Sequence, residues 1–587
     1  MEGPGGTRRL DGNLGWAHLA RTESVGFRWR GLRPARVERT IPGRDGAYLE
    51  RGGVVSEDPQ HQTVKAVPGA APSSALKGRQ VGWAAALLAG SVLLSRLLGF
   101  VREMVLADRQ GIGSSTDAFS AAFQIPDILN YLLAGGALAI AFTPLYLKKL
   151  QEEGEESSTA LFHSVLGSLG IVTVVLTAAL WWQAPAVIDW QFSDFGPETR
   201  NLTVRLTRIV LPAQVFFVLG GITRAVLMAH GRFGAQAAAP LLYNGGIIVG
   251  GLAGSGIEGF AWGALGGAFV GAFCVPLWQI RSVVPLGLRW APLDPAFRSY
   301  LLAALPLMLG LSLTTVDEWY ERWFGQAIGV GVLASLAYAR RLMMAPVAVL
   351  GQAVATAALP TLASLHAEGR PEALNQLLGR TLRLTLLGAM LLSGGLMVLA
   401  SPIVRVLYER GAFSAEDSVR VSVLLGILAW AVPGWVSQQV AVRAFFARGE
   451  MWRPMLIGTG LALLALPLYA WATQYWAAPG LAMAGVVAIS INAGVTVGWA
   501  RVRFEGPRLA PVGGTILRGL VIAGAAAMAA SYWAPVSTGF WGALLELAVG
   551  GGLYGAVAAL GLIVLGDREA KQGLKGILSR RRKRSGA

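Results

Sequence analysis

The chain has 587 residues, of which 54% are hydrophobic and 14% charged, and its mean hydropathy is +0.52. Soluble domains are about 45–50% apolar and about 25% charged, so this composition excludes an ordinary soluble protein and predicts an all-α polytopic membrane protein. The single cysteine, Cys274, excludes a disulfide within the chain. The sequence has no P-loop, nucleophile elbow, dinucleotide fingerprint or HExxH pair, which argues against an ATP-driven pump and against an enzyme.

The net charge of +16 is concentrated toward the two ends of the chain. Residues 1–77 contain 12 Lys and Arg against 8 Asp and Glu, are rich in Gly, Arg and Pro, and lack an apolar h-region. We expect them to be a disordered extension and not a signal peptide. Residues 567–587 contain 8 basic and 2 acidic residues. This basic tail is typical of a cytoplasmic flank that touches anionic lipid, and we expect no nucleic-acid partner.

Between these ends the sequence predicts fourteen apolar spans, each long enough to cross about 30 Å of hydrocarbon. Lysine and arginine are more frequent in the loops on the side of the N-terminus, so we expect both termini in the cytoplasm. The predicted spans are 81–106, 116–147, 159–188, 203–229, 236–256, 259–281, 298–324, 329–361, 375–400, 418–446, 453–473, 480–501, 512–533 and 540–566.

An internal repeat relates two groups of six spans. Pro144 and Pro360 are 216 residues apart, Arg224 and Arg443 are 219 apart, and other landmarks recur at nearly the same spacing. Six spans return the chain to the same side of the membrane, so the two halves have the same topology. The sequence therefore predicts an N-lobe (78–290), a C-lobe (291–505) and two additional helices (506–566), an arrangement typical of alternating-access transporters.

Two regions carry charges inside apolar spans. Residues 95–103 read SRLLGFVRE, residues 115–119 read STDAF, and FQIPDILNYLLAGGALAIAFTP follows. In the other half, residues 338–362 read YARRLMMAPVAVLGQAVATAALPTL. These motifs resemble the SRxLGFxR(D/E), TDAF and YAxRL motifs of the MurJ/MviN family, the lipid II flippases of the bacterial cell envelope. The resemblance covers about residues 80–566 and implies the fold of the MOP superfamily, with two extra helices as in MurJ.

The resemblance implies that Arg102 and Arg341 are cavity arginines that bind the substrate diphosphate. A guanidinium stays charged and offers a fork of donors that suits phosphate, although Arg102 could instead snorkel to the interface. Glu103 matches the acidic residue of the family motif, and we expect it to compensate arginines across the cavity when substrate is absent. Adjacent helical residues point about 100° apart, so its partner is expected on another helix.

Four further residues are candidates. Asp117 matches the aspartate of TDAF, and with Ser114 it forms an apparent capping box at the start of its own helix. Asn130 occupies a place where relatives often carry arginine, and it can still bond a phosphate oxygen. Arg340 is expected to supply positive charge from the opposite lobe. Glu321 and Arg322 resemble an Asp-Arg pair of some relatives, in which the acidic residue is associated with a sodium ion. A sodium site needs several oxygen ligands.

Helix breakers lie in the same two spans. Pro126, Gly135 and Gly136 interrupt the second span, and Pro346 and Gly351 interrupt the eighth. Such positions can bend during opening and closing, or they can serve local packing.

The leading hypothesis is a flippase of the bacterial inner membrane that moves lipid II, without a bound cofactor, from the cytoplasmic to the outer leaflet. A sodium ion or the membrane potential would drive it, and cell-wall synthesis proteins are candidate partners. The alternatives are a flippase for another polyprenyl-diphosphate glycan, an ion-coupled antiporter of the MOP superfamily, and a scaffold for envelope synthesis. An ion-coupled antiporter should need carboxylates within its membrane spans. The predicted spans contain few carboxylates and more arginines, so the sequence favours a transporter of an anionic substrate over an antiporter.

Overall fold

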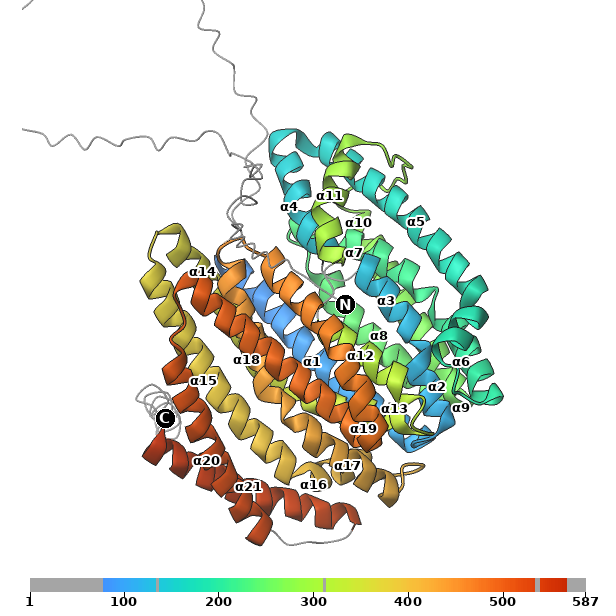
Figure 1. Cartoon of the computed structure of the whole chain (residues 1–587). Coiled ribbons are helices and arrows are strands. Elements are labelled where there is room, and N and C mark those ends of the chain that lie inside the picture. Colours follow the sequence, from blue (N-terminus) through green and yellow to red (C-terminus); the bar gives the residue numbers. More distant parts are fainter. Residues whose placement is uncertain (1–77, 134–136, 310–312, 534–538, 567–587) are drawn as a thin grey trace, which may run out of the picture. The chain divides into compact units, whose positions relative to one another are not determined.

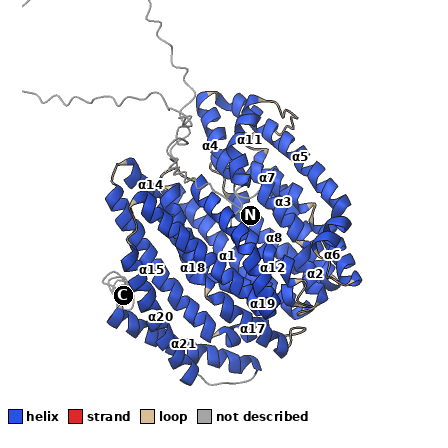
Figure 2. Cartoon of the chain, in the orientation of Figure 1, coloured by secondary structure: helices blue, strands red, loops and turns tan. Residues whose placement is uncertain are grey.

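The computed structural model describes residues 78–133, 137–309, 313–533 and 539–566. Within these ranges all regular structure is helical (Figure 2), so the predicted all-α class is confirmed. The predictions for residues 1–77, for Gly135 and Gly136, and for the tail 567–587 lie outside the described residues.

We call residues 78–290 the N-lobe and residues 291–505 the C-lobe. The helices of the N-lobe are α1 (Gly78–Gln110), α2 (Ser114–Ala122), α3 (Gln124–Leu133), α4 (Ala137–Glu152), α5 (Gly154–Gln191), α6 (Pro197–Val210), α7 (Ala213–Ala229), α8 (Gly234–Ala253), α9 (Gly256–Gly267), the π-helical segment η1 (Ala268–Cys274) and α10 (Val275–Ile280).

The C-lobe follows the same plan, and two helices come after it. Its elements are α11 (Pro295–Leu309), α12 (Leu313–Gly325), α13 (Val332–Pro346), the π-helical segment η2 (Val347–Gln352), α14 (Ala353–Ala367), α15 (Pro371–Val398), α16 (Ala400–Tyr408), α17 (Ala415–Ala429), α18 (Ala431–Phe446) and α19 (Trp452–Phe504), followed by α20 (Leu509–Trp533) and α21 (Gly539–Leu565).

Each predicted span coincides with one helix, with part of α19, or with a run of consecutive short helices. Eight helical runs of the described chain are long and apolar enough to cross a membrane, or nine if α17 and α18, bent by 42°, count as one span. Helix α19 would be about 80 Å long if it were straight, but non-helical backbone at Ala477 divides it. That break lies between the two spans predicted at 453–473 and 480–501.

Proline explains the irregular part of the eighth span. Pro346 ends α13, and the π-helical segment η2, which contains Gly351, follows immediately. Proline removes a backbone donor and clashes with the preceding turn, and π-helical turns are common where a helix is interrupted at a functional site. Pro126, by contrast, lies in the first turn of α3, a position that tolerates proline.

The repeat is visible in the backbone at the turns. Gly231 and Gly449, which lie in the turns after α7 and α18, both adopt a positive φ, 72° and 74°. Gly154 and Gly369, 215 residues apart, do the same with φ of 88° and 67°. Only glycine adopts this conformation without steric cost, so both halves of the chain turn in the same way at corresponding points.

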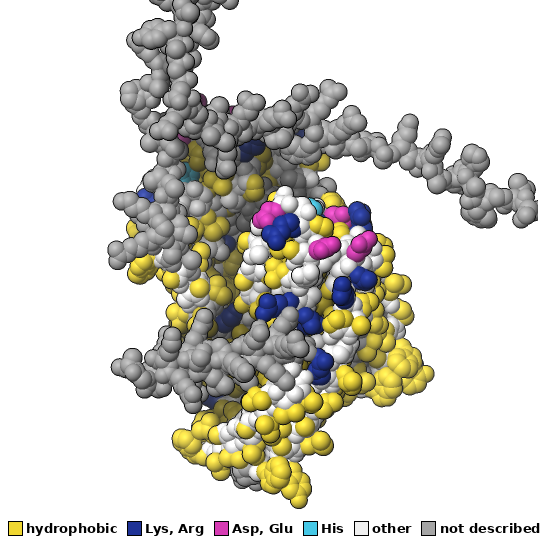
Figure 3. Space-filling view, turned by 90° about the vertical axis from the view of Figure 1, so that its left-hand side faces the viewer, with side chains coloured by type: hydrophobic (Ala, Val, Ile, Leu, Met, Phe, Trp, Pro, Cys, Tyr) yellow, Lys and Arg dark blue, Asp and Glu magenta, His cyan; other side chains and the backbone are white. Residues whose placement is uncertain are grey.

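Packing joins the lobes through helices that are adjacent in space but distant in sequence. The largest buried cluster includes Leu106 and Phe260 of the N-lobe with Tyr338 and Trp435 of the C-lobe. Helix α1 packs along α8, whereas α20 and α21 pack on each other and on α15 and α16 (Figure 1). Hydrophobic side chains cover much of the described surface in Figure 3, as expected for a protein embedded in lipid.

Candidate functional site

A cavity of about 420 Å³ lies between the lobes. Helices α1, α2, α3, α8 and α9 of the N-lobe and α12 and α13 of the C-lobe contribute side chains to its wall. Its charged lining residues are Arg102, Glu103, Asp127, Glu318, Glu321, Arg322, Arg340 and Arg341. Four arginines are thus matched by four carboxylates. The expectation that arginines dominate the cavity is therefore wrong, because three carboxylates on α3 and α12 offset them.

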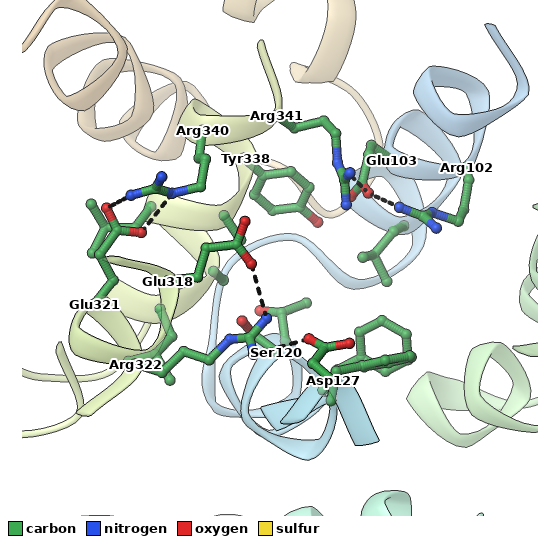
Figure 4. A pocket seen from close by; sticks show the side chains of 18 of the residues that line it. Arg102, Glu103, Ser120, Asp127, Glu318, Glu321, Arg322, Tyr338, Arg340 and Arg341 are labelled. Carbon is green, nitrogen blue, oxygen red and sulfur yellow. Dashed lines mark hydrogen bonds and ion pairs between the residues drawn. The ribbon is translucent and has the colours of Figure 1, made fainter. Parts of the chain in front are cut away.

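Glu103 connects the two predicted diphosphate arginines. One of its carboxylate oxygens, Oε1, lies 2.5 Å from the guanidinium of Arg102 and 3.2 Å from Nε of Arg341 (Figure 4). Arg102 is on α1 of the N-lobe and Arg341 on α13 of the C-lobe, so one carboxylate holds cations from both lobes. Glu103 thus has the partner predicted on another helix, which is Arg341. It also forms an ion pair with Arg102, its neighbour in the sequence.

Arg102 is further oriented by a polar residue of α8. Its Nη1 donates to Oδ1 of Asn244 at 3.2 Å. The amide of Asn244 in turn donates to the Pro240 carbonyl at 3.1 Å and to the Ser95 hydroxyl at 3.3 Å. These contacts fix Arg102 inside the cavity wall. They are inconsistent with the alternative in which it snorkels to the membrane surface.

Arg340, next to Arg341 in the sequence, has a different environment. It donates through Nε to Glu321 at 2.9 Å and through Nη2 to the other oxygen of Glu321 (Figure 4). Its Nη2 also lies 2.7 Å from Oδ2 of Asp317. The hydroxyl of Tyr469 also bonds Asp317. Arg340 is therefore a buried structural cation, and it does not supply free positive charge as expected.

The same contacts bear on the predicted sodium ligand. Both carboxylate oxygens of Glu321 bond to Arg340, and the searched, described residues contain no group of three His, Cys, Asp or Glu that could hold a metal ion. Glu321 does not pair with Arg322, its neighbour in the sequence. Because Arg340 already occupies both carboxylate oxygens of Glu321, these residues do not fit a resident sodium ion.

Arg322 instead links the lobes on the opposite wall of the cavity. Its Nη1 lies 3.1 Å from Oδ2 of Asp127, on α3, and its Nη2 lies 3.9 Å from Glu318 (Figure 4). The same Nη1 lies 2.9 Å from Oε1 of Gln124, also on α3. The sequence analysis missed Asp127, Asp317 and Glu318. The i, i+4 spacing of Glu318 and Arg322 was the available signal, whereas nothing in the sequence points from Arg322 to Asp127, 195 positions away.

Asp117 makes a different cap from the one predicted. In its own helix, Gly113 and Thr116 form the reciprocal contact, and Asp117 takes no part in it. Its buried carboxylate instead accepts from the backbone N–H groups of Gly331 at 2.5 Å and Ala334 at 2.8 Å. Asp117 thus caps the first turn of α13, so a residue of the N-lobe completes a helix of the C-lobe.

The remaining candidate and a second cavity lie apart from this site. Asn130 is half-buried on α3 and does not line the charged cavity. An apolar cavity of about 890 Å³ is bounded by α15, α18, α19 and α20, and none of its lining residues is charged. It suits a hydrocarbon chain and not a diphosphate.

Comparison with known proteins finds the same family in a family model and in individual relatives. The family model described as "Lipid II flippase MurJ" matches residues 106–549. A probable lipid II flippase MurJ of Rhizobium meliloti is 31% identical over 425 residues, which cover 70% of this chain and 78% of that protein. The lipid II flippase MurJ of Burkholderia cenocepacia is 29% identical over 393 residues, covering 64% and 75% respectively.

Solved structures show the same fold. A lipid II flippase MurJ in an inward closed conformation superposes with a TM-score of 0.69 at 20% identity, over 81% of this chain and 98% of that one. An inward-facing multidrug transporter of the MATE family, in the MOP superfamily, gives a TM-score of 0.60 at 15% identity, over 70% and 94%. The chain therefore belongs to the lipid II flippase MurJ family and is a multi-pass protein of the bacterial inner membrane and not an enzyme.

Proposed function

We propose that this protein moves lipid II from the cytoplasmic to the outer leaflet by alternating access, with Arg102 and Arg341 holding the diphosphate. The observation that carries the proposal is the position of the Glu103 carboxylate between these two guanidinium groups. An anion held by arginines of both lobes is the arrangement that a bound diphosphate would need. Glu103 then serves as the internal counter-ion of the substrate-free site.

The exposure of these groups supports exchange of one anion for another. The side chain of Arg341 is 52% exposed, whereas those of Arg102 and Glu103 are 17% and 10% exposed. A diphosphate entering the cavity would meet Arg341 first and could then compete with Glu103 for both guanidinium forks. Charge-assisted contacts of this kind are stronger in a cavity of low dielectric than in water.

Contacts between the lobes indicate which end of the cavity is closed. Asp117 caps α13, and the N–H of Ala412, before α17, donates to the Asp108 carbonyl of α1 at 2.8 Å. Gln326, after α12, donates to the Gln191 carbonyl at the end of α5. All of these lie at the ends of helices that the positive-inside rule assigns to the outer side. With both termini in the cytoplasm, these contacts close the outer end of the cavity in this conformation.

The membrane potential suits this direction of transport. An interior-negative potential favours outward movement of an anionic headgroup by about 2.3 kcal/mol per elementary charge per 100 mV. No step at Glu321 requires sodium, because Arg340 already occupies its oxygens. A flippase for another polyprenyl-diphosphate glycan is the second candidate, favoured by Asn130, which stands where relatives often carry arginine.

The test is complementation of a strain depleted of its lipid II flippase. We expect the full chain to restore growth, and Arg102→Ala and Arg341→Ala, produced at equal levels, to fail. Arg205→Ala is the matched control because Arg205 also pairs with one carboxylate, Glu258, but lies outside the cavity. Growth supported by both cavity variants would exclude this site, and failure of a well-inserted wild type would favour the other glycans.

A further inference from the structure

The segment that joins the two lobes is held against α5. Residues 281–294, which connect α10 to α11 and which we call the linker, run beside that helix (Figure 1). The N–H of Arg289 donates to the His163 carbonyl of α5 at 3.2 Å, and the N–H of Ala291 donates to the Ser168 hydroxyl at 3.1 Å. Because these bonds use the backbone of the linker, they leave its side chains free to face outward.

The exposure of α5 gives the depth of the linker in the membrane. Residues 161–170 of α5 are buried or half-buried, and a Cβ added to Gly167 would lie 2.4 Å from the Arg289 carbonyl oxygen, so the linker covers this part of the helix. Large apolar side chains of α5 are then exposed from Ile171 to Trp190. About 20 helical residues span about 30 Å, the thickness of bilayer hydrocarbon. The linker therefore lies at the headgroup level, next to one end of this apolar band.

The outward side chains of the linker are unusually apolar for a loop. Leu288, Trp290 and Leu293 are 76%, 55% and 90% exposed. Burying such side chains in hydrocarbon is favourable, and tryptophan is enriched where headgroups meet acyl chains. These three residues therefore form an apolar surface at the depth of the membrane interface.

Three arginines accompany this apolar surface. Arg281 and Arg289 belong to the linker, and Arg298 lies in the first turn of α11. All three are exposed, and none of them forms an ion pair with another described residue. The acid in this stretch, Asp294, accepts from the Ala296 N–H at 2.8 Å and so caps α11. Three arginines and one aspartate leave residues 281–298 with a net charge of +2.

Other exposed arginines in loops of the same predicted side already have counter-ions. Arg370 pairs with Glu368 at 3.2 Å, and Arg453 and Arg503 pair with Glu450 at 3.1 and 3.2 Å. The arginines at the linker have no such partner in the described chain. Phosphate groups are the anions that occur at the depth of the linker, and a guanidinium binds them well.

From these observations we propose that the linker is a docking site for anionic phospholipids of the cytoplasmic leaflet. Leu288, Trp290 and Leu293 enter the acyl region, and the three arginines bind the headgroup phosphates. The leaflet follows from the orientation with both termini in the cytoplasm. The site is separate from the charged cavity, so the inference goes beyond the proposed function and does not depend on which lipid-linked glycan is transported.

The experiment measures which lipids surround the linker. Leu288→Cys in a Cys274→Ser background is labelled with bimane, and the full chain is reconstituted into vesicles of phosphatidylglycerol and phosphatidylcholine. Either lipid in turn carries brominated acyl chains, which quench the fluorophore on contact. We expect both lipids to quench the label, and the ratio of quenching to show about threefold or greater enrichment of phosphatidylglycerol. Sodium chloride at high concentration should lower this enrichment, because salt screens exposed charges.

A control site and matched variants assign the enrichment to the linker. Val175→Cys, labelled in the same way, lies on the exposed apolar band of α5 and should be quenched equally by the two lipids. Replacing the three arginines at the linker with glutamine should lower the enrichment to about one, while replacing three paired arginines should leave it unchanged. The linker variant is Arg281→Gln, Arg289→Gln and Arg298→Gln, and its control is Arg370→Gln, Arg453→Gln and Arg503→Gln.

Three results would overturn the docking site. Absence of quenching at position 288 by both lipids would place the linker in water. Equal quenching by the two lipids in wild type would leave an apolar contact with no preference for anionic lipid. Enrichment that persists in the linker variant would assign the preference to charges elsewhere in the chain. Quenching at Val175→Cys is measured in every variant, so that loss of the preference is not confused with failure to insert.

Discussion

Two adjacent arginines on α13 show how much a residue's surroundings decide its role. The side chain of Arg340 is 7% exposed and is held by Asp317 and Glu321, whereas that of Arg341 is 52% exposed and faces the cavity. Replacing Arg340 with alanine leaves two buried carboxylates without their cation. We expect Arg340→Ala to lower the free energy of unfolding by about 3–5 kcal/mol and Arg341→Ala to lower it by less than about 1 kcal/mol.

Thermal unfolding of the detergent-purified variants measures this difference. Arg341→Ala is the control because it removes the same side chain from the next position of the same helix. We expect Arg340→Ala to unfold at a clearly lower temperature and Arg341→Ala to unfold near wild type while failing in complementation. Equal unfolding temperatures would show that the buried ion pair does not stabilise the C-lobe.

The same residues show what the sequence could and could not predict about the site. Motif context placed Arg102, Glu103 and Arg341 at the cavity, and the structure brings them together. Asp127 was missed because a carboxylate in a helix does not reveal which distant helix supplies its partner, whereas the i, i+4 spacing of Glu318 and Arg322 was an available signal. Arg340 was misjudged for the same reason. Its ion pairs depend on the packing of α12 against α13, and local sequence does not encode that packing.

At the scale of a helix, the N-terminus of α13 depends on a residue of the other lobe. The first N–H groups of a helix lack partners within it, and Asp117 of α2 supplies two acceptors to α13. Replacing Asp117 with alanine removes that cap in the closed conformation, at a cost of about 1–3 kcal/mol. We therefore expect Asp117→Ala to favour separation of α2 from α13, shifting the equilibrium about 5- to 150-fold.

Labelling of a cysteine in the cavity reports this shift. With Cys274→Ser as background, Ser120→Cys places a thiol on the cavity wall, and a membrane-impermeant maleimide is added from the outer side. Labelling should rise in Asp117→Ala and stay unchanged in Ser414→Ala. Ser414 caps α17 from within the same lobe, accepting from the Asp417 N–H at 3.1 Å. A rise of equal size in both variants would mean that weakening any cap loosens the protein.

Helices themselves were more predictable than their caps. Length, hydropathy and the position of prolines are local properties, so the spans, the break near Ala477 and the interruption after Pro346 could be read from the sequence. The caps could not be read from the sequence in the same way. The predicted capping box of Ser114 and Asp117 does not form, because Gly113 and Thr116 make that contact and the Asp117 carboxylate caps α13. A pattern of two polar residues does not show which helix N-terminus their side chains cap.

For the whole molecule, the decisive property is which end of the cavity is closed, and sequence alone could not give it. A two-lobe transporter exchanges two arrangements of the same helices, so one sequence must be compatible with both. In this conformation the backbones of the lobes meet at two glycines. A Cβ added to Gly111 would lie 2.3 Å from the Ala412 carbonyl oxygen, and one added to Gly411 would lie 2.3 Å from that of Asp108.

These contacts predict that glycine is needed here for closure and not only for the turn. Gly111 has a φ of 59°, and Gly256, with a φ of 66°, has open space where a Cβ would be. Alanine costs about 1 kcal/mol of backbone strain at either position. At Gly111 its Cβ would also collide with the Ala412 carbonyl, so the two lobes would have to move apart. We expect Gly111→Ala to increase outer labelling of the cavity cysteine and to reduce complementation, while Gly256→Ala leaves both near wild type. If the two variants behaved alike, backbone strain would be the only cost, and the close approach of α1 to the segment before α17 would not hold the outer end shut.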